Sequence, residues 1–169
     1  MGEVEKSALL FWCQKIVNDP EMLAEDPRGV KIGAPGFRLD PGEDLKTFCN
    51  IGAQRICRGL NYNNLDDMVA DEMYKYLIKN WIMPIGNLAE KFLAAYSAAV
   101  VGDLCVLAWY QKPHGHVAVC APLRPMLYSG KWSCYVPQVA NVGKTNGFTG
   151  ANYAFTEPPD VFVLGRTIA

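Results

Sequence analysis

The sequence predicts one α+β domain, in which helices from the first part of the chain pack on a mostly antiparallel sheet from the last part. Apolar residues recur at helical spacing in four segments before residue 100, and short apolar runs separated by turn-forming residues follow residue 102. The chain has 169 residues, of which 50% are hydrophobic, so it is long enough to bury a core. We therefore expect residues 1–169 to form a single domain.

The composition disfavours several classes of function. A formal net charge of −1, without a long run of either sign, disfavours nucleic-acid binding, which needs a basic face. The apolar stretches fall short of the roughly 20 residues that a membrane span needs, and the acidic N-terminus lacks a secretory signal pattern. The 6 cysteines form no Cys-x-x-Cys pair. The sequence therefore predicts no zinc site, and it implies no other metal or cofactor.

The first helix is expected over residues 3–18, where apolar residues recur every three or four positions and Pro20 follows the end of the pattern. Residues 20–44 contain several prolines and glycines and show no periodicity. Because this segment leads to Cys49, it is either the wall of a cleft or a plain connector.

A short helix is expected over residues 48–59, whose apolar residues share one face. Thr47 is the expected N-cap. Cys49 would then lie in the first turn, where unpaired backbone N–H groups and the positive end of the helix dipole favour a thiolate.

Two further helices precede the sheet. The first is expected over residues 65–79 with Asn64 as its cap, and the second over residues 87–99 with Asn87 as its cap.

Four apolar runs rich in valine, leucine and aromatic residues predict the strands, at residues 104–110, 116–121, 134–140 and 160–164. The first two runs are almost continuously apolar, so we expect central strands that are covered on both faces. His116 opens the second run, which would place its ring at an exposed end of a buried strand.

Cys49 and His116 are candidates for a nucleophile and its base. The chain has only 2 histidines, and the other, His114, is expected at the surface. A thiol hydrolase needs a base near the thiol, a polar group that orients the base, and N–H donors for the oxyanion. From residue type alone, a core cysteine and a surface histidine explain these positions as well.

Three short motifs in a set order strengthen the assignment: residues 47–50 (TFCN), 102–106 (GDLCV) and 115–119 (GHVAV). Helices are expected between the first motif and the second. In the order of these motifs the chain resembles the CHAP-type cysteine amidases and peptidases, which are papain-like and cut peptidoglycan. The resemblance covers roughly residues 44–142.

The resemblance implies a papain-like fold, with Cys49 as nucleophile and His116 as base. The third residue of the family is usually an Asn, Asp or Glu on the strand after the histidine strand. Here Gln138 and Asn141 both offer an amide oxygen, and Asn141 is the one expected. Asn50, beside the nucleophile, is open to three roles: helix cap, oxyanion donor or substrate contact.

The implied activity is that of a peptidoglycan endopeptidase or amidase, with the stem peptide as substrate and the bacterial cell wall as its place of action. If the protein is an antibacterial effector, an immunity or inhibitor protein would be a further partner. Two other classes stay open. One is a papain-like binding or structural module without activity, and the other is a thiol redox or acyltransferase protein that uses Cys49 and Cys57.

Overall fold

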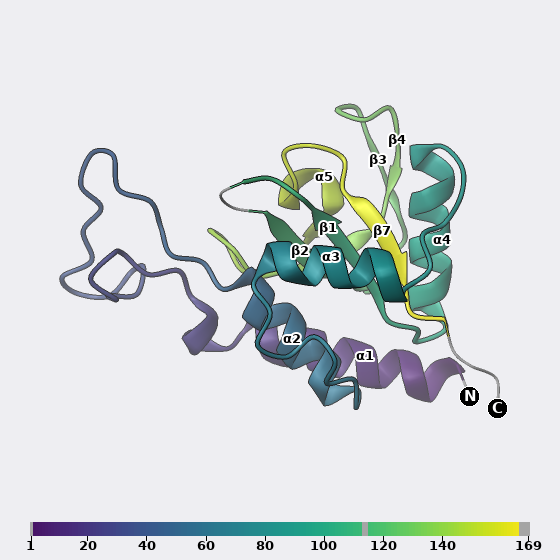
Figure 1. The fold of residues 1–169 in the computed structure, drawn as a ribbon, viewed down its shortest axis with the longest axis horizontal. Coiled ribbons are helices and arrows are strands. Elements are labelled where there is room, and N and C mark those ends of the chain that lie inside the picture. The colour runs from purple at the N-terminus through teal and green to yellow at the C-terminus, as the bar shows by residue number, and fades with distance from the viewer. Residues whose placement is uncertain (1, 113–114, 166–169) are drawn as a thin grey trace.

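The structure is a computed structural model, and it describes residues 2–112 and 115–165. Helices dominate its first part and strands its last part (Figure 1). The helices are α1 (Gly2–Val17), the 3-10 helix η1 (Pro20–Met22), α2 (Cys49–Gly59), α3 (Ala70–Asn80), α4 (Leu88–Val100) and α5 (Ala151–Ala154). The strands are β1 (Cys105–Trp109), β2 (His116–Cys120), β3 (Leu127–Ser129), β4 (Cys134–Val136), β5 (Gln138–Asn141), β6 (Gly147–Gly150) and β7 (Asp160–Val163).

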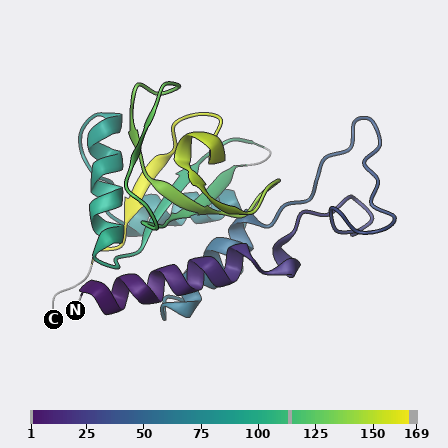
Figure 2. The ribbon, with the colours of Figure 1, turned by 180° about the vertical axis from the view of Figure 1, so that it is seen from behind.

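Five strands form one sheet in the order β6-β5-β2-β1-β7, and each neighbouring pair is antiparallel. Strands β3 and β4 form a separate hairpin. Helix α2 packs on β2, and α1 packs on α2. Figure 2 shows α1 on the opposite side of the molecule from the hairpin and α5. The expected α+β class, with N-terminal helices on a mostly antiparallel sheet, is confirmed.

The two strands expected at the centre are buried. Val117 and Ala118 point to opposite faces of β2, and their exposed fractions are only 1% and 2%. The neighbouring strand β1 is buried from Cys105 to Ala108. Burying a valine or leucine side chain in such a core stabilises the fold by about 1.5–3 kcal/mol. The sheet is therefore a rigid support for the residues at the ends of its strands.

Three expected boundaries were wrong. The helix expected over residues 65–79 begins only at Ala70, because Asp67 has a positive φ of 63° and breaks the helical path. Phe48, rather than Thr47, is the N-cap of α2, and no side chain caps it. The strand expected over residues 134–140 is two strands separated by Pro137, which has no N–H to donate to a ladder.

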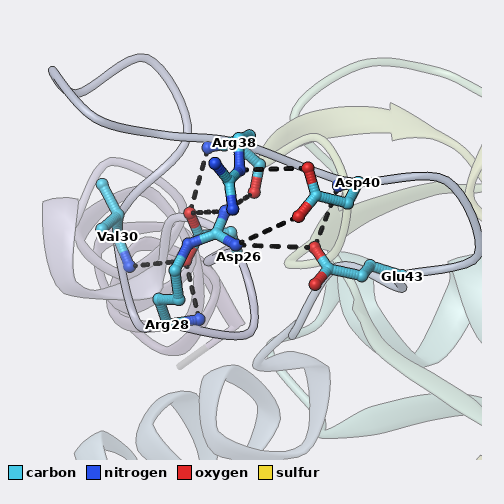
Figure 3. Close-up of polar contacts among 6 residues, drawn as sticks. All are labelled: Asp26, Arg28, Val30, Arg38, Asp40 and Glu43. Carbon is cyan, nitrogen blue, oxygen red and sulfur yellow. Dashed lines mark hydrogen bonds and ion pairs between the residues drawn. The ribbon is translucent and has the colours of Figure 1, made fainter.

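Residues 23–47, which we call the arm, extend away from the body of the molecule (Figure 1). The buried carboxylate of Asp26 organises it (Figure 3). Its Oδ1 accepts from the backbone N–H groups of Arg28 and Val30 at 2.8 and 3.1 Å, and its Oδ2 accepts from that of Arg38 at 3.0 Å. The Arg28 guanidinium also donates to Oδ2. The Asp26 carboxylate thus closes the loop, and ion pairs of Arg28 with Asp40 and Glu43 lie beside it.

Replacing Asp26 by alanine is expected to open the arm and leave the body folded. Four donors would lose their acceptor, and hydrogen bonds to a charged group are among the stronger ones in proteins. We expect proteolysis within the arm to accelerate at least about tenfold, measured by limited proteolysis with mass spectrometry. Asp44→Ala, at an exposed aspartate of the same arm, is the control. Equal cleavage of both variants would contradict the role of Asp26.

Acid should open the arm in the same way. Burial of the Asp26 carboxyl raises its pKa, but the hydrogen bonds from Arg38, Val30 and Arg28 outweigh this and lower the pKa to about 2. Since this value lies below the ordinary 3.8, the stabilisation is complete above about pH 4 and is lost as the pH falls toward 2.

Candidate functional site

Cys49 is the first residue of α2, and the packing of α2 on β2 brings its sulfur against the sheet. The backbone N–H groups of Val117, Asn50 and Cys49 itself lie close enough to this sulfur to lower the pKa of the thiol. The side chain is 7% exposed. Burial raises the pKa of the thiol and outweighs the lowering by the three N–H groups. The resting thiol is therefore protonated, and a base must take its proton before it can act as a nucleophile.

His116 begins β2 and immediately precedes Val117, whose backbone N–H lies close to the sulfur of Cys49. Its Nε2 lies 2.8 Å from Oδ1 of Asn141, the last residue of β5. An amide oxygen only accepts, so Nε2 carries the hydrogen and Nδ1 keeps its lone pair. The amide group of Asn141 cannot be reversed without loss, because its Nδ2 donates to the carbonyl of Thr145 at 2.7 Å.

The surroundings of His116 favour the neutral imidazole. Burial lowers its pKa below the ordinary 6.5, and the hydrogen bond with Asn141 opposes this in part. The ring of Phe155 packs edge-on against it, with centroids 4.9 Å apart. At neutral pH the imidazole is thus able to accept a proton at Nδ1, as a general base must.

The structure separates the two candidates for the third residue. Asn141 reaches His116, whereas Gln138 lies three positions earlier on β5 and points to the opposite face of the sheet. Gln138 pairs with Gly150 of β6, and its carbonyl accepts from Ala121. Only Asn141 is therefore placed to orient the imidazole.

Asn50 is not the cap of α2, because Phe48 is the N-cap. Its roles as oxyanion donor or substrate contact stay predictions. Its Nδ2 donates to the carbonyl of Met68 at 3.1 Å, and Gln54 donates to the same oxygen at 2.5 Å. These two bonds attach the segment before α3 to the face of α2. They help to hold α2, and therefore Cys49, in place.

A close approach of α2 to the end of β5 also sets the geometry of the site. A Cβ on Gly52, one turn after Cys49, would lie 2.7 Å from Val142. Next to Val142, the N–H of Gly143 donates to Asn146, whose own amide donates to the carbonyl of Met22 at 2.8 Å. Sequence reasoning missed this support, although the Asn-Gly pair at 146–147 signals a turn.

The base of the arm meets the residue before the nucleophile. Nζ of Lys31 lies 4.4 Å from the ring centre of Phe48, and Nζ of Lys46 lies 5.5 Å from it. The arm is thus attached next to Cys49. Whether it is a cleft wall or a connector stays a prediction.

The other thiols show no partnership with Cys49. All six cysteines are free. Cys57 is fully buried, and burial raises its pKa to about 12. This arrangement gives no support to a redox pair of Cys49 and Cys57. His114 lies outside the described residues.

Among residues 2–112 and 115–165, no group of three or more histidine, cysteine or acidic side chains is placed to hold a metal ion. No helix in this part of the chain is long and apolar enough to cross a membrane.

No protein-family model matches the chain, and no curated protein matches it. The sequence motifs and the positions of Cys49, His116 and Asn141 are therefore what indicates a function.

Proposed function

We propose that this protein is a cysteine-dependent amide hydrolase of papain-like type that cleaves peptide bonds of peptidoglycan, as an endopeptidase or an amidase. One observation carries the proposal. His116 and Asn141 are joined at 2.8 Å, and His116 begins β2, the strand on which α2 packs with Cys49 as its first residue. This is the arrangement that a nucleophile, a base and an orienting group require.

In the proposed reaction, Nδ1 of His116 takes the proton of the Cys49 thiol as the sulfur attacks the carbonyl carbon. The oxyanion accepts from the Cys49 N–H at the start of α2. Asn141 holds the imidazolium through the proton on Nε2. This imidazolium then gives the Nδ1 proton to the leaving amine, and a thioester remains. Water, deprotonated by His116, breaks the thioester, releasing the acid and restoring the thiol.

The substrate assignment rests on the resemblance to the CHAP type rather than on the site. Peptidoglycan stem peptides carry the amide bonds that this chemistry cleaves, and the place of action would be the bacterial cell wall. The fold and the charge of the chain are compatible with such a substrate.

The proposal is tested by incubating purified peptidoglycan with the protein and identifying the released fragments by mass spectrometry. Each cleaved bond is expected to add one water, leaving a new amine on one product and a new carboxylic acid on the other, and the fragment masses name the bond. Protein treated with iodoacetamide, which alkylates reactive thiols, is the control and should release none. If intact protein releases nothing from several wall types, the peptidoglycan substrate is wrong.

A second candidate is a papain-like module without catalytic activity. The low exposure of the Cys49 thiol and its raised pKa favour it. A protein of this kind would bind peptidoglycan in a sedimentation assay and leave its amide bonds intact, so the same digestion separates the two candidates.

A further inference from the structure

Two adjoining hollows lie between the β3–β4 hairpin and α5. The larger has a volume of about 470 Å³ and the smaller one of about 90 Å³. Tyr128, Asn152 and Tyr153 line both hollows, so the two form one continuous depression, which we call the aromatic groove. The larger hollow falls in the usual size range of small-molecule sites, about 300–1,000 Å³.

The groove presents aromatic rings to water. Tyr128 is 61% exposed and Tyr153 is 81% exposed. Tyr135 packs against Tyr128 at a ring distance of 5.5 Å and is itself largely exposed. Side chains that combine an apolar ring with a hydroxyl are frequent where a protein binds a ligand that has both kinds of surface.

Gln138 supplies a second, independent indication of a ligand. It lines the smaller hollow and is only 6% exposed. Its Oε1 is buried and has no hydrogen-bond partner among the described residues. A buried acceptor without a donor costs stability. A ligand N–H or O–H at this end of the groove would remove that cost.

The groove is held together and is linked to the candidate catalytic site. Lys131, in the hairpin loop, donates to the carbonyl of Phe155 at 3.0 Å and more weakly to that of Asn152. Phe155 lines the larger hollow, and its ring also packs on His116. The charged residues that line the two hollows are Arg124 and Lys131, so the lining carries no negative charge.

We propose that the aromatic groove binds an N-acetylated saccharide segment, the glycan part of the substrate. Tyrosine rings can cover the apolar face of a pyranose, an acetamido N–H can donate to Gln138, and sugar hydroxyls can pair with Asn152. The absence of acidic side chains from the lining suits a neutral or weakly anionic sugar. The choice of saccharide rests on the proposed function, because Phe155 places the groove beside the residue that would act on the attached peptide.

The test is a calorimetric titration of Cys49→Ala protein with oligomers of N-acetylglucosamine and with glycan strands freed of their peptides. We expect saturable binding to both, weakened at least about tenfold by Tyr153→Ala or by Tyr128→Ala. Phe11→Ala is the matched control and should not change the affinity, because Phe11 is 59% exposed on α1, on the other side of the molecule.

The outcomes separate this inference from the proposed function. If Cys49→Ala protein binds neither saccharide while the unaltered protein digests peptidoglycan, the inference is wrong and the hydrolase proposal stands. Binding that both tyrosine variants retain at full strength also contradicts the inference, because the saccharide then lies elsewhere. Groove-dependent binding by a protein that digests no peptidoglycan supports the inference and rejects the hydrolase.

Discussion

Replacing Cys49 by alanine is expected to lower the rate of peptidoglycan cleavage at least about 1,000-fold, because loss of a nucleophile removes the covalent step altogether. The fold should survive, since the change removes only one sulfur atom from the buried core. The measurement is release of new amines from purified peptidoglycan, with the thermal unfolding midpoint recorded for the same samples.

Cys134→Ala is the matched control for this prediction. Cys134 lies on β4 and has the same exposed fraction of 7%, so both variants lose a thiol of equal accessibility. We expect the control to keep its activity. Full activity of Cys49→Ala, or equal losses in the two variants, would show that the thiol of Cys49 is not the nucleophile.

The second large effect is expected at Asn141. Its replacement by alanine removes the acceptor that keeps the hydrogen of His116 on Nε2, so the imidazole loses its orientation and preferred tautomer. We expect kcat to fall by about 100-fold or more. Asn18→Ala, at an exposed asparagine after α1, should leave kcat unchanged.

The pH profile separates orientation of the imidazole from a merely structural role. Cleavage needs neutral His116, and burial holds its pKa below 6.5, so activity should fall on the acid side of that value. The bond to Asn141 raises this pKa. Its loss in Asn141→Ala therefore moves the acid limb to lower pH. Asn141→Asp restores an acceptor with a negative charge and moves the limb to higher pH. If the acid limb of the pH profile stays in place in both variants, Asn141 does not orient the imidazole of His116.

Local signals predicted several elements well. The helix expected over residues 87–99 is α4. The side chain of Asn87 accepts from the backbone N–H of Glu90, and the side chain of Glu90 accepts from the backbone N–H of Asn87. Both bonds lie within one turn, so the local sequence is enough to start the helix. Elements that depend on distant partners were missed. Strand β6, for example, is rich in glycine and exists because it pairs with β5.

The arm also combines a feature that local sequence predicts with one that depends on a distant partner. Its prolines and glycines predicted a long irregular segment, but no local pattern marks Asp26 as its centre. The carboxylate organises the arm by accepting from Arg38, which is 12 positions away. Such a contact depends on the path of the whole loop.

The sequence by itself determined the fold class, the placement of Cys49 at the start of a helix and that of His116 at the start of a strand, because periodicity and turn residues act over a few positions. It favoured Asn141 as the third residue, but residue type did not separate Asn141 from Gln138, since both side chains offer the same amide oxygen. The tertiary structure decided this, because strand alternation and the pairing of β5 with β2 turn only Asn141 toward His116. It alone also placed Gln138 in the aromatic groove, since that position depends on how the hairpin packs beside α5.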